Sequence, residues 1–155
     1  MICALMMGRA GSVGFPGKNL SPVLGRPLCA YPLMAAKASR YVDRIFVSTD
    51  SREIIDIACA YGAEVINRPP ELATKEVLGE DVFKHGYREI VKRLETEGKQ
   101  VEFMVLLLAN AATISGELID RGIEKLRADP TLDSAVSVSV YNMWSPLRAR
   151  KLGPD

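Results

Sequence analysis

The amino-acid sequence predicts an α/β protein with three layers, in which helices cover both faces of a mostly parallel sheet. Apolar runs of strand length alternate with longer segments of helical period along the chain, the pattern typical of such sheets. The run at residues 103–108 is almost continuously apolar, as in a central parallel strand covered on both faces. The run at residues 2–7 leads directly into a glycine-rich loop over residues 8–19, which carries Arg9 and Lys18. Because such loops turn backbone N–H groups toward phosphate, we expect a Rossmann-like fold that binds a nucleotide.

The size and charge of the chain limit the classes of partner. With 155 residues, of which 48% are hydrophobic, the chain is long enough for one domain with a substantial core. Its 20 basic and 19 acidic residues leave a net charge of +1, so no overall field attracts nucleic acid or an anionic membrane. Its apolar runs are far shorter than a bilayer span, and residues 2–7 are too short for the apolar core of a signal peptide. We therefore expect a cytoplasmic protein that binds neither nucleic acid nor membrane.

The first half of the chain predicts a β-α-β-α unit that begins with the first strand. Residues 28–39 are expected to form a helix and residues 44–48 a second strand. Asp50 and Glu53 fit a capping box at the start of the next helix, which Gly62 ends.

The second half continues the alternation of strands and helices. Residues 64–67 are expected to form a short strand, and residues 79–97 form a long amphipathic pattern. After the strand at residues 103–108, Ser115 is placed to cap a further helix. Residues 135–140 alternate with period two, as a half-exposed strand does.

Polar segments follow three of the expected strands. They are the glycine loop, residues 48–50 and residues 109–110. Ligands bind outside the carboxyl ends of the strands in open parallel sheets, so these segments are expected to meet at one site. Taken alone, Asp50 has an alternative role as a helix cap, and Asn110 as the start of a turn. The expected convergence of the three segments favours a binding site.

The spacing of the glycines excludes two common kinds of nucleotide site. A Walker A loop has four residues between its first glycine and a Gly-Lys pair that serine or threonine follows. Here Gly11 lies one residue too far from Gly17, and Asn19 replaces the hydroxyl residue. A dinucleotide fingerprint has the order Gly-x-Gly-x-x-Gly, whereas the glycines of this loop are spaced by three throughout. An ordinary NTPase and a dehydrogenase are therefore not expected.

The loop from Gly8 through Asn19 resembles the opening signature of the acylneuraminate cytidylyltransferases, the CMP-sialic acid synthetases and their relatives. That signature reads Ala-Arg-Gly-Gly-Ser-Lys-Gly-x-Pro-x-Lys-Asn. Residues 44–50 resemble the second strand of the family, and residues 67–73 resemble its Arg-Pro-x-x-Leu-Ala segment. The three blocks stand in the family's order and cover roughly the first half of the chain.

The resemblance implies a reaction in which a sugar hydroxyl attacks the α-phosphate of CTP, pyrophosphate leaves and Mg²⁺ offsets the developing charge. Arg9 and Lys18 match the basic positions expected to hold the triphosphate and carry catalysis. The positions carried over as nucleotide-binding are Ala10, Gly11, Ser12, Asn19 and Arg68. Of these, Asn19 and Arg68 match positions near the cytosine edge. Without the family match, Arg68 reads as a surface arginine in a proline-rich turn.

The chain departs from the family pattern at positions that bear on activity and acceptor. Val13 stands where the family usually has lysine. After the strand at residues 103–108, the sialic-acid enzymes read Leu-Gln-Pro-Thr-Ser-Pro-Leu-Arg, and here Leu108 and Ile114 replace the glutamine and the arginine. The acceptor is therefore expected to differ from sialic acid. Asn110 is a candidate sugar contact. Arg148 is a candidate for the acceptor carboxylate, with an exposed tail arginine that has no ligand role as the alternative.

The resemblance also bears on domain organisation. We expect a nucleotide-binding domain over residues 1–140 and the incomplete start of a substrate and dimerisation segment over residues 141–155. Relatives continue through a dimerising segment and a late pair of aspartates associated with Mg²⁺, so a truncated product or a shortened homologue is expected, with a homodimer as the full-length form. The metal ligands cannot be identified in this chain.

The leading hypothesis is a cytidylyltransferase that transfers CMP from CTP to a nonulosonate-like sugar acid. One alternative is a catalytically silent or fragmentary nucleotide-binding module, which Val13 favours. The other is a sugar-1-phosphate nucleotidyltransferase, although the Gly-Thr-Arg and Pro-Lys-Pro segments usual in its first loop are missing here.

Overall fold

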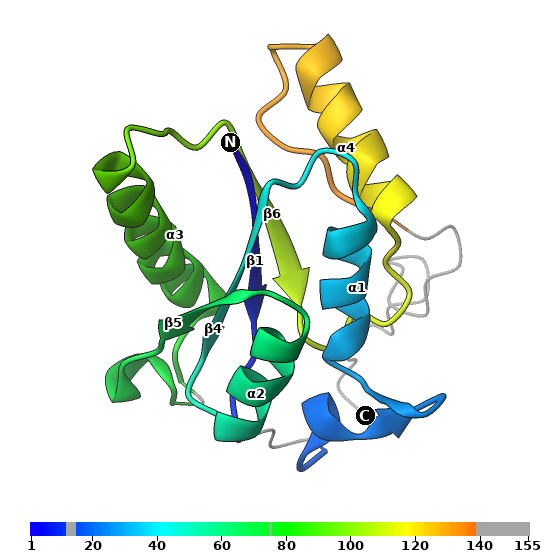
Figure 1. Ribbon diagram of the computed structural model, residues 1–155, viewed down its shortest axis with the longest axis vertical. Helices are drawn as coiled ribbons and strands as arrows, with labels where there is room; N and C mark the ends of the chain where they lie inside the picture. The colour runs from blue at the N-terminus through cyan, green and yellow to red at the C-terminus, as the bar shows by residue number, and fades with distance from the viewer. Residues whose placement is uncertain (12–14, 75, 139–155) are drawn as a thin grey trace, which may run out of the picture.

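A four-stranded parallel sheet forms the centre of the fold, in the order β5-β4-β1-β6 (Figure 1). The structure is a computed structural model, and it describes residues 1–11, 15–74 and 76–138. The strands are β1 (Ile2–Met7), β4 (Arg44–Thr49), β5 (Glu64–Asn67) and β6 (Phe103–Leu108). The predicted α/β class and the parallel sheet are confirmed.

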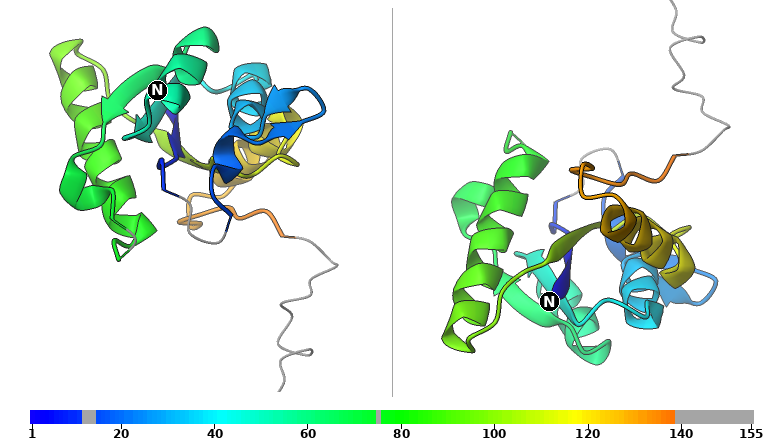
Figure 2. Two further views of the ribbon diagram at one scale, coloured as in Figure 1. Left: turned by 90° about the horizontal axis from the view of Figure 1, so that it is seen from below. Right: turned by 90° about the horizontal axis from the view of Figure 1, so that it is seen from above.

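Helices cover both faces of this sheet, which makes three layers (Figure 2). Helices α1 (Ala30–Ala38), α2 (Arg52–Ala60) and α4 (Gly116–Ala128) pack on one face. Helix α3 (Gly79–Thr96) packs on the other face. Within the described part of the chain, no helix is both long enough and apolar enough to cross a membrane.

Strand β1 is the centre of the core. Its side chains alternate between the faces, so that Ile2, Ala4 and Met6 contact the layer of α1, α2 and α4. Cys3 and Leu5 contact the layer of α3. Because both faces are covered, each of these five side chains is at most 1% exposed, which explains why this strand is continuously apolar.

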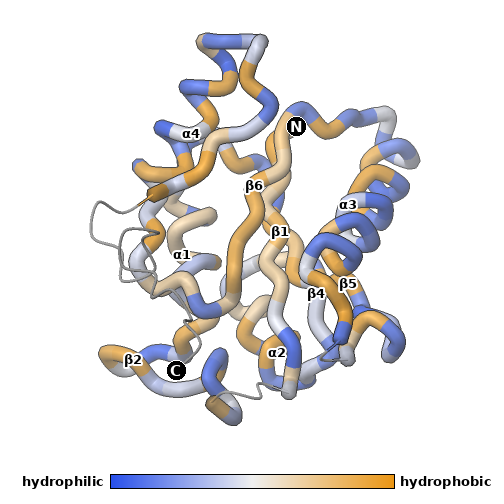
Figure 3. Tube along the Cα trace, turned by 180° about the vertical axis from the view of Figure 1, so that it is seen from behind, coloured by the Kyte–Doolittle hydropathy of each residue, from blue (hydrophilic) through white to orange (hydrophobic). Residues whose placement is uncertain are grey.

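The placement of β6 corrects one prediction. Residues 103–108 form a strand as expected, but it lies at an edge of the described sheet and not at its centre. Leu107 is buried under the helices, whereas Leu106 and Leu108 on the opposite face are each 51% exposed. Figure 3 shows β6 as a largely hydrophobic strand beside β1. The main contacts of α3 with the sheet are to β1 and β4. Met104 of β6 packs against the same apolar cluster as α3, but Leu106 and Leu108 remain exposed.

The predicted caps are correct at one helix and shifted at another. Ser115 caps α4 as expected, because its Oγ accepts the N–H of Leu118 at 3.2 Å. At α2, however, the N-cap is Ser51 and not Asp50, since the Oγ of Ser51 accepts the N–H of Ile54. The side chain of Asp50 is therefore available for another contact.

Two segments differ from the pattern expected of them. Residues 135–138 form no strand, and Val136 and Val138 are 79% and 90% exposed; residues 139 and 140 lie outside the described residues. A short hairpin of β2 (Pro22–Val23) and β3 (Arg26–Pro27) was not expected. The hairpin directly follows the short 3₁₀ helix η1 (Lys18–Leu20). A second short 3₁₀ helix, η2 (Pro70–Leu72), comes later in the chain, after β5.

A buried carboxylate joins α4 to the end of α1. Asp120 is only 4% exposed. Its oxygens accept the Oγ–H of Ser39 at 2.6 Å and the Nε–H of Arg40 at 2.9 Å, as well as the backbone N–H of Arg40. Since the carboxylate is fully hydrogen-bonded, its burial is compatible with a stable fold.

Replacing Asp120 with asparagine should lower the free energy of unfolding by about 1–2 kcal/mol near neutral pH, because the amide loses the charge that Ser39 and Arg40 contact. Desolvation alone would raise the pKa of Asp120, but these hydrogen bonds hold it below its ordinary value of 3.8. The stabilisation is therefore present above about pH 4 and is lost as the pH falls through the lowered folded pKa. Denaturant unfolding of both proteins near neutral pH and at about pH 2 tests this. A difference that does not shrink in acid would contradict it.

Candidate functional site

A cleft of about 300 Å³ opens at the carboxyl ends of β1 and β6. Its walls come from four parts of the chain: residues 7–9, 18–19 and 108–110, and six of the described residues between 68 and 82. The first two run from the last residue of β1 into the glycine loop and η1, and the third begins with the last residue of β6. Two of the three segments that the sequence predicted to converge, the glycine loop and residues 109–110, line this cleft. Thr49 and Asp50 of the third segment line a second hollow, which shares Arg68 and Thr74 with the cleft.

Most of the candidate site residues predicted from the sequence line this cleft or lie beside it. Those that line it are Arg9, Lys18, Asn19, Arg68 and Asn110. Ala10 and Gly11 are exposed on the glycine loop beside it. Ser12, Val13 and Arg148 lie outside the described residues.

Arg68 is a buried cation and not the surface arginine of the alternative interpretation. It is 8% exposed, and its guanidinium donates to the carbonyl oxygen of Ser48 at 2.7 Å and to the Oγ of Ser48 at 3.4 Å. Burial lowers the pKa of Arg68, the carboxylate of Asp50 raises it, and the charge of Arg9 lowers it. An arginine stays protonated under these influences, so the cleft contains a fixed positive charge.

The end of β4 holds the start of the glycine loop. The backbone N–H of Gly8 donates to the carbonyl oxygen of Ser48 at 3.2 Å, and that of Ala10 donates to Oδ1 of Asp50 at 3.0 Å. A side chain at Gly8 would meet Ala109 and Ile54 at 3.2 Å, so glycine permits this close approach of the loop to its neighbours.

Two further hydrogen bonds involve Arg9, one across the cleft and one within the glycine loop. Nη1 of Arg9 donates to the carbonyl oxygen of Thr74 at 3.0 Å. Nδ2 of Asn19 donates to the carbonyl oxygen of Arg9 at 3.4 Å. Sequence reasoning did not identify Ser48 and Thr74 as individual contacts, because both contribute main-chain carbonyl groups that every residue type carries.

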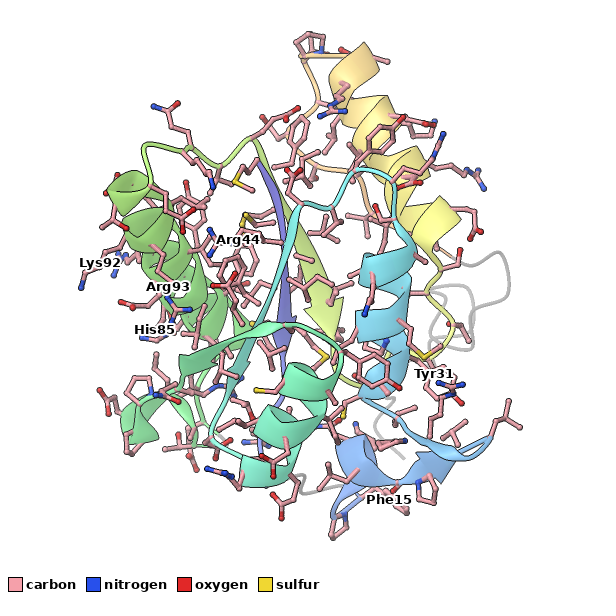
Figure 4. All side chains as sticks on the ribbon, in the orientation of Figure 1. Phe15, Tyr31, Arg44, His85, Lys92 and Arg93 are labelled. Carbon is pink, nitrogen blue, oxygen red and sulfur yellow. The ribbon has the colours of Figure 1, made fainter. Side chains whose placement is uncertain are left out.

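Two arginines of the cleft differ in their partners from the arginines that face Glu64. Arg44 and Arg93, labelled in Figure 4, both lie within 4 Å of the carboxylate of Glu64. Arg9 and Arg68 instead donate to neutral carbonyl and hydroxyl oxygens. Neutral acceptors do not cancel the charge of a guanidinium, although the carboxylate of Asp50 offsets part of the charge of Arg68. With Arg9 and Lys18 also lining the cleft, this end of the sheet is suited to an anionic ligand.

The family model of the cytidylyltransferases matches residues 3–143 of the chain. The N-acylneuraminate cytidylyltransferase of Escherichia coli is 38% identical over 84 residues, which cover 54% of this chain and 20% of that protein. The CMP-N,N'-diacetyllegionaminic acid synthase of Legionella pneumophila is 47% identical over 64 residues, which cover 41% of this chain and 28% of that protein. The 3-deoxy-manno-octulosonate cytidylyltransferase of Bdellovibrio bacteriovorus is 29% identical over 134 residues, covering 86% of this chain and 49% of that protein.

Solved structures share the fold. A CMP:2-keto-3-deoxy-manno-octonic acid synthetase complexed with CTP superposes with a TM-score of 0.62 at 20% identity, over 84% of this chain and 49% of that one. This chain thus spans about half the length of that enzyme and less of the sialic-acid relatives. The family match extends over nearly the whole sequence, and it confirms the resemblance seen in the glycine loop. The chain belongs to the cytidylyltransferase family of nucleotidyltransferase enzymes.

Proposed function

We propose that this chain carries the nucleotide site of an enzyme that transfers CMP from CTP to a sugar acid and releases pyrophosphate. The observation that carries the proposal is the cleft itself. It brings Arg9, Lys18 and Arg68 together at the carboxyl ends of the parallel strands. Family membership makes CTP the expected nucleotide.

The chemistry needs positioning and charge more than it needs covalent catalysis. An acceptor hydroxyl oxygen bonds to the α-phosphorus as the bond to the leaving pyrophosphate breaks, and negative charge accumulates on the phosphate oxygens. Arg9 and Lys18 line the cleft from the two ends of the glycine loop, where cations would stabilise that charge. Arg68 adds a third positive charge. Its guanidinium is already held in place by the hydrogen bond to Ser48.

The names of the relatives support a sugar acid as the acceptor class. These proteins act on N-acylneuraminate, diacetyllegionaminic acid and 3-deoxy-manno-octulosonate according to their names. In this chain Asn110 lines the cleft beside the end of β6. An amide at this position would offer a donor and an acceptor to a sugar hydroxyl.

Mg²⁺ and a homodimer remain part of the proposal. Within residues 1–11, 15–74 and 76–138, no three histidine, cysteine or acidic side chains gather as a metal site. We therefore assign no ligand to Mg²⁺ among these residues. Mg²⁺ is commonly bound through substrate phosphates and few carboxylates, so it would enter with CTP.

Pyrophosphate release tests the proposed function directly. We expect release with CTP and Mg²⁺ in the presence of one member of a panel of nonulosonic acids. Lys18→Ala should weaken CTP binding about tenfold, because one charge–phosphate contact is lost. The matched control is Lys92→Ala, since Lys92 is an exposed lysine on α3 (Figure 4).

The outcomes separate the alternatives. Activity restricted to another nucleotide would exclude CTP as the substrate. Mg²⁺-dependent CTP binding in a calorimeter without turnover on any acceptor would instead support the silent or fragmentary nucleotide-binding module. Equal effects of Lys18→Ala and Lys92→Ala would contradict the role of Lys18.

A further inference from the structure

Asp50 has a contact that neither its expected role nor the walls of the cleft explain. Ser51 supplies the cap of α2, so the helix does not need the carboxylate of Asp50. Instead, Oδ1 of Asp50 accepts the backbone N–H of Ala10 at 3.0 Å. The two residues are 40 positions apart in sequence, so this bond connects the end of β4 to the glycine loop.

Ala10 and Gly11 at the start of the glycine loop depend on such bonds because packing does not hold them. Ala10 and Gly11 are exposed, and a side chain built on Gly11 would meet no atom within 4 Å. Loops with few buried contacts open easily unless hydrogen bonds restrain them. Gly8 is tied to Ser48 at the base of the loop, the carbonyl oxygen of Arg9 accepts Nδ2 of Asn19 at 3.4 Å, and the N–H of Ala10 is tied to Asp50 at 3.0 Å.

The position of Asp50 suits it to act through its neighbours. It lines a second hollow together with Thr49 and Asn67, and it is not among the residues that line the cleft. Arg68 and Thr74 line both hollows. Arg9, which precedes Ala10, crosses the cleft to the carbonyl oxygen of Thr74. The carboxylate of Asp50 is thus hydrogen-bonded to Ala10, the residue that directly follows Arg9.

We propose that Asp50 is a positioning residue for the nucleotide site: by accepting the N–H of Ala10 it holds the first turn of the glycine loop, and with it Arg9, where the triphosphate binds. The inference rests on the proposed function. A hydrogen bond from a backbone N–H to a carboxylate is charge-assisted and stronger than one between neutral groups. The same carboxylate acts on the charge of Arg68, so the bond to Ala10 lies beside the buried cation of the cleft.

The test compares Asp50→Ala, Asp50→Asn and the control Asp56→Ala by calorimetry with CTP and Mg²⁺. Asp56 is an exposed acidic residue on α2 whose contact is an i,i+4 pair with Arg52. Asp50→Ala should raise the dissociation constant of CTP about tenfold, as expected for loss of one charge-assisted bond. Asp50→Asn keeps an oxygen that accepts the N–H of Ala10, so it should stay within about threefold of the wild type. Asp56→Ala should bind CTP as the wild type does.

A second readout examines the bond without nucleotide. Hydrogen exchange of the Ala10 amide, followed by NMR in the free protein, should accelerate in Asp50→Ala and remain slow in Asp50→Asn, with equal thermal midpoints. Wild-type CTP affinity in Asp50→Ala would overturn the inference, as would binding in Asp50→Asn as weak as in Asp50→Ala. Failure of the wild type itself to bind CTP would instead overturn the proposed function, and with it this role of Asp50.

Discussion

Replacing Arg68 with alanine should weaken CTP binding about one hundredfold, a loss of about 2.8 kcal/mol. The guanidinium is buried at the wall of the cleft and is held by the main chain of β4. In such a site a charge acts on a bound anion with little screening by water. The substitution removes this charge and also removes one of the two donors to the carbonyl oxygen of Ser48, the other being the N–H of Gly8.

Lysine is not expected to substitute for Arg68. Its single ammonium group lacks the planar set of donors with which arginine contacts both oxygens of Ser48. We expect Arg68→Lys to recover less than about tenfold of the lost affinity, because it restores the charge without the geometry. The comparison of the two variants separates the contribution of the charge from that of the position.

Arg127→Ala is the matched control for Arg68→Ala. Arg127 also donates from its guanidinium to a single partner, the carboxylate of Glu102, but it is an exposed residue of α4 that does not line the cleft. Calorimetry with CTP and thermal unfolding of all three variants provide the measurement. If Arg127→Ala reduces CTP affinity as much as Arg68→Ala does, the effect of Arg68 reflects general destabilisation and not a role in the site.

Local patterns in the sequence identified much of the fold. The strand at residues 64–67 has the bounds of β5, and the cap at Ser115 lies where it was expected. Both depend on neighbouring residues only. The order of the strands depends on contacts across the whole chain, so the apolar run of β6 could not reveal that Leu106 and Leu108 lie at an exposed edge.

The shift of the α2 cap from Asp50 to Ser51 has a similar origin. Aspartate and serine are both good N-caps, so local preference does not choose between them. The distant N–H of Ala10 takes the carboxylate of Asp50, and the hydroxyl of Ser51 is left to cap the helix. The hairpin turn was missed because Leu24 adopts a positive φ of 46° before Gly25. Leucine is rare in that conformation.

The sequence predicts the residues that line the cleft better than it predicts the contacts that hold them in place. Loops after adjacent parallel strands meet at one edge of the sheet, which brings Arg9 and Asn110 into one cleft although 100 residues separate them. Those residues carry distinctive side chains. Thr74 acts through its carbonyl oxygen, and the shorter bond of Arg68 to Ser48 is also to a carbonyl oxygen, with Oγ of Ser48 as a second, longer acceptor. Only the folded backbone shows where the carbonyl oxygens point.

Replacing Gly116 with alanine should lower the free energy of unfolding by about 2 kcal/mol, within the range for overpacked sites. Gly116 is the first residue of α4, where that helix meets the end of α1. An added methyl group would lie 2.8 Å from the carbonyl carbon of Ala38 and 2.9 Å from its oxygen. Backbone atoms cannot rotate away as a flexible side chain does, so the two helices would have to separate.

For Gly122→Ala on the same helix, we expect a change in stability of the opposite sign. A methyl group there would lie 3.8 Å from the Cβ of Ala135, an ordinary contact. Since alanine is the better helix former, this variant should be more stable than the wild type by roughly 0.5–1 kcal/mol. Thermal unfolding should therefore move the two midpoints in opposite directions, down by about 4–8 °C for Gly116→Ala and slightly up for Gly122→Ala. Shifts of the same sign and size would mean that α1 and α4 do not approach each other as closely as Gly116 requires.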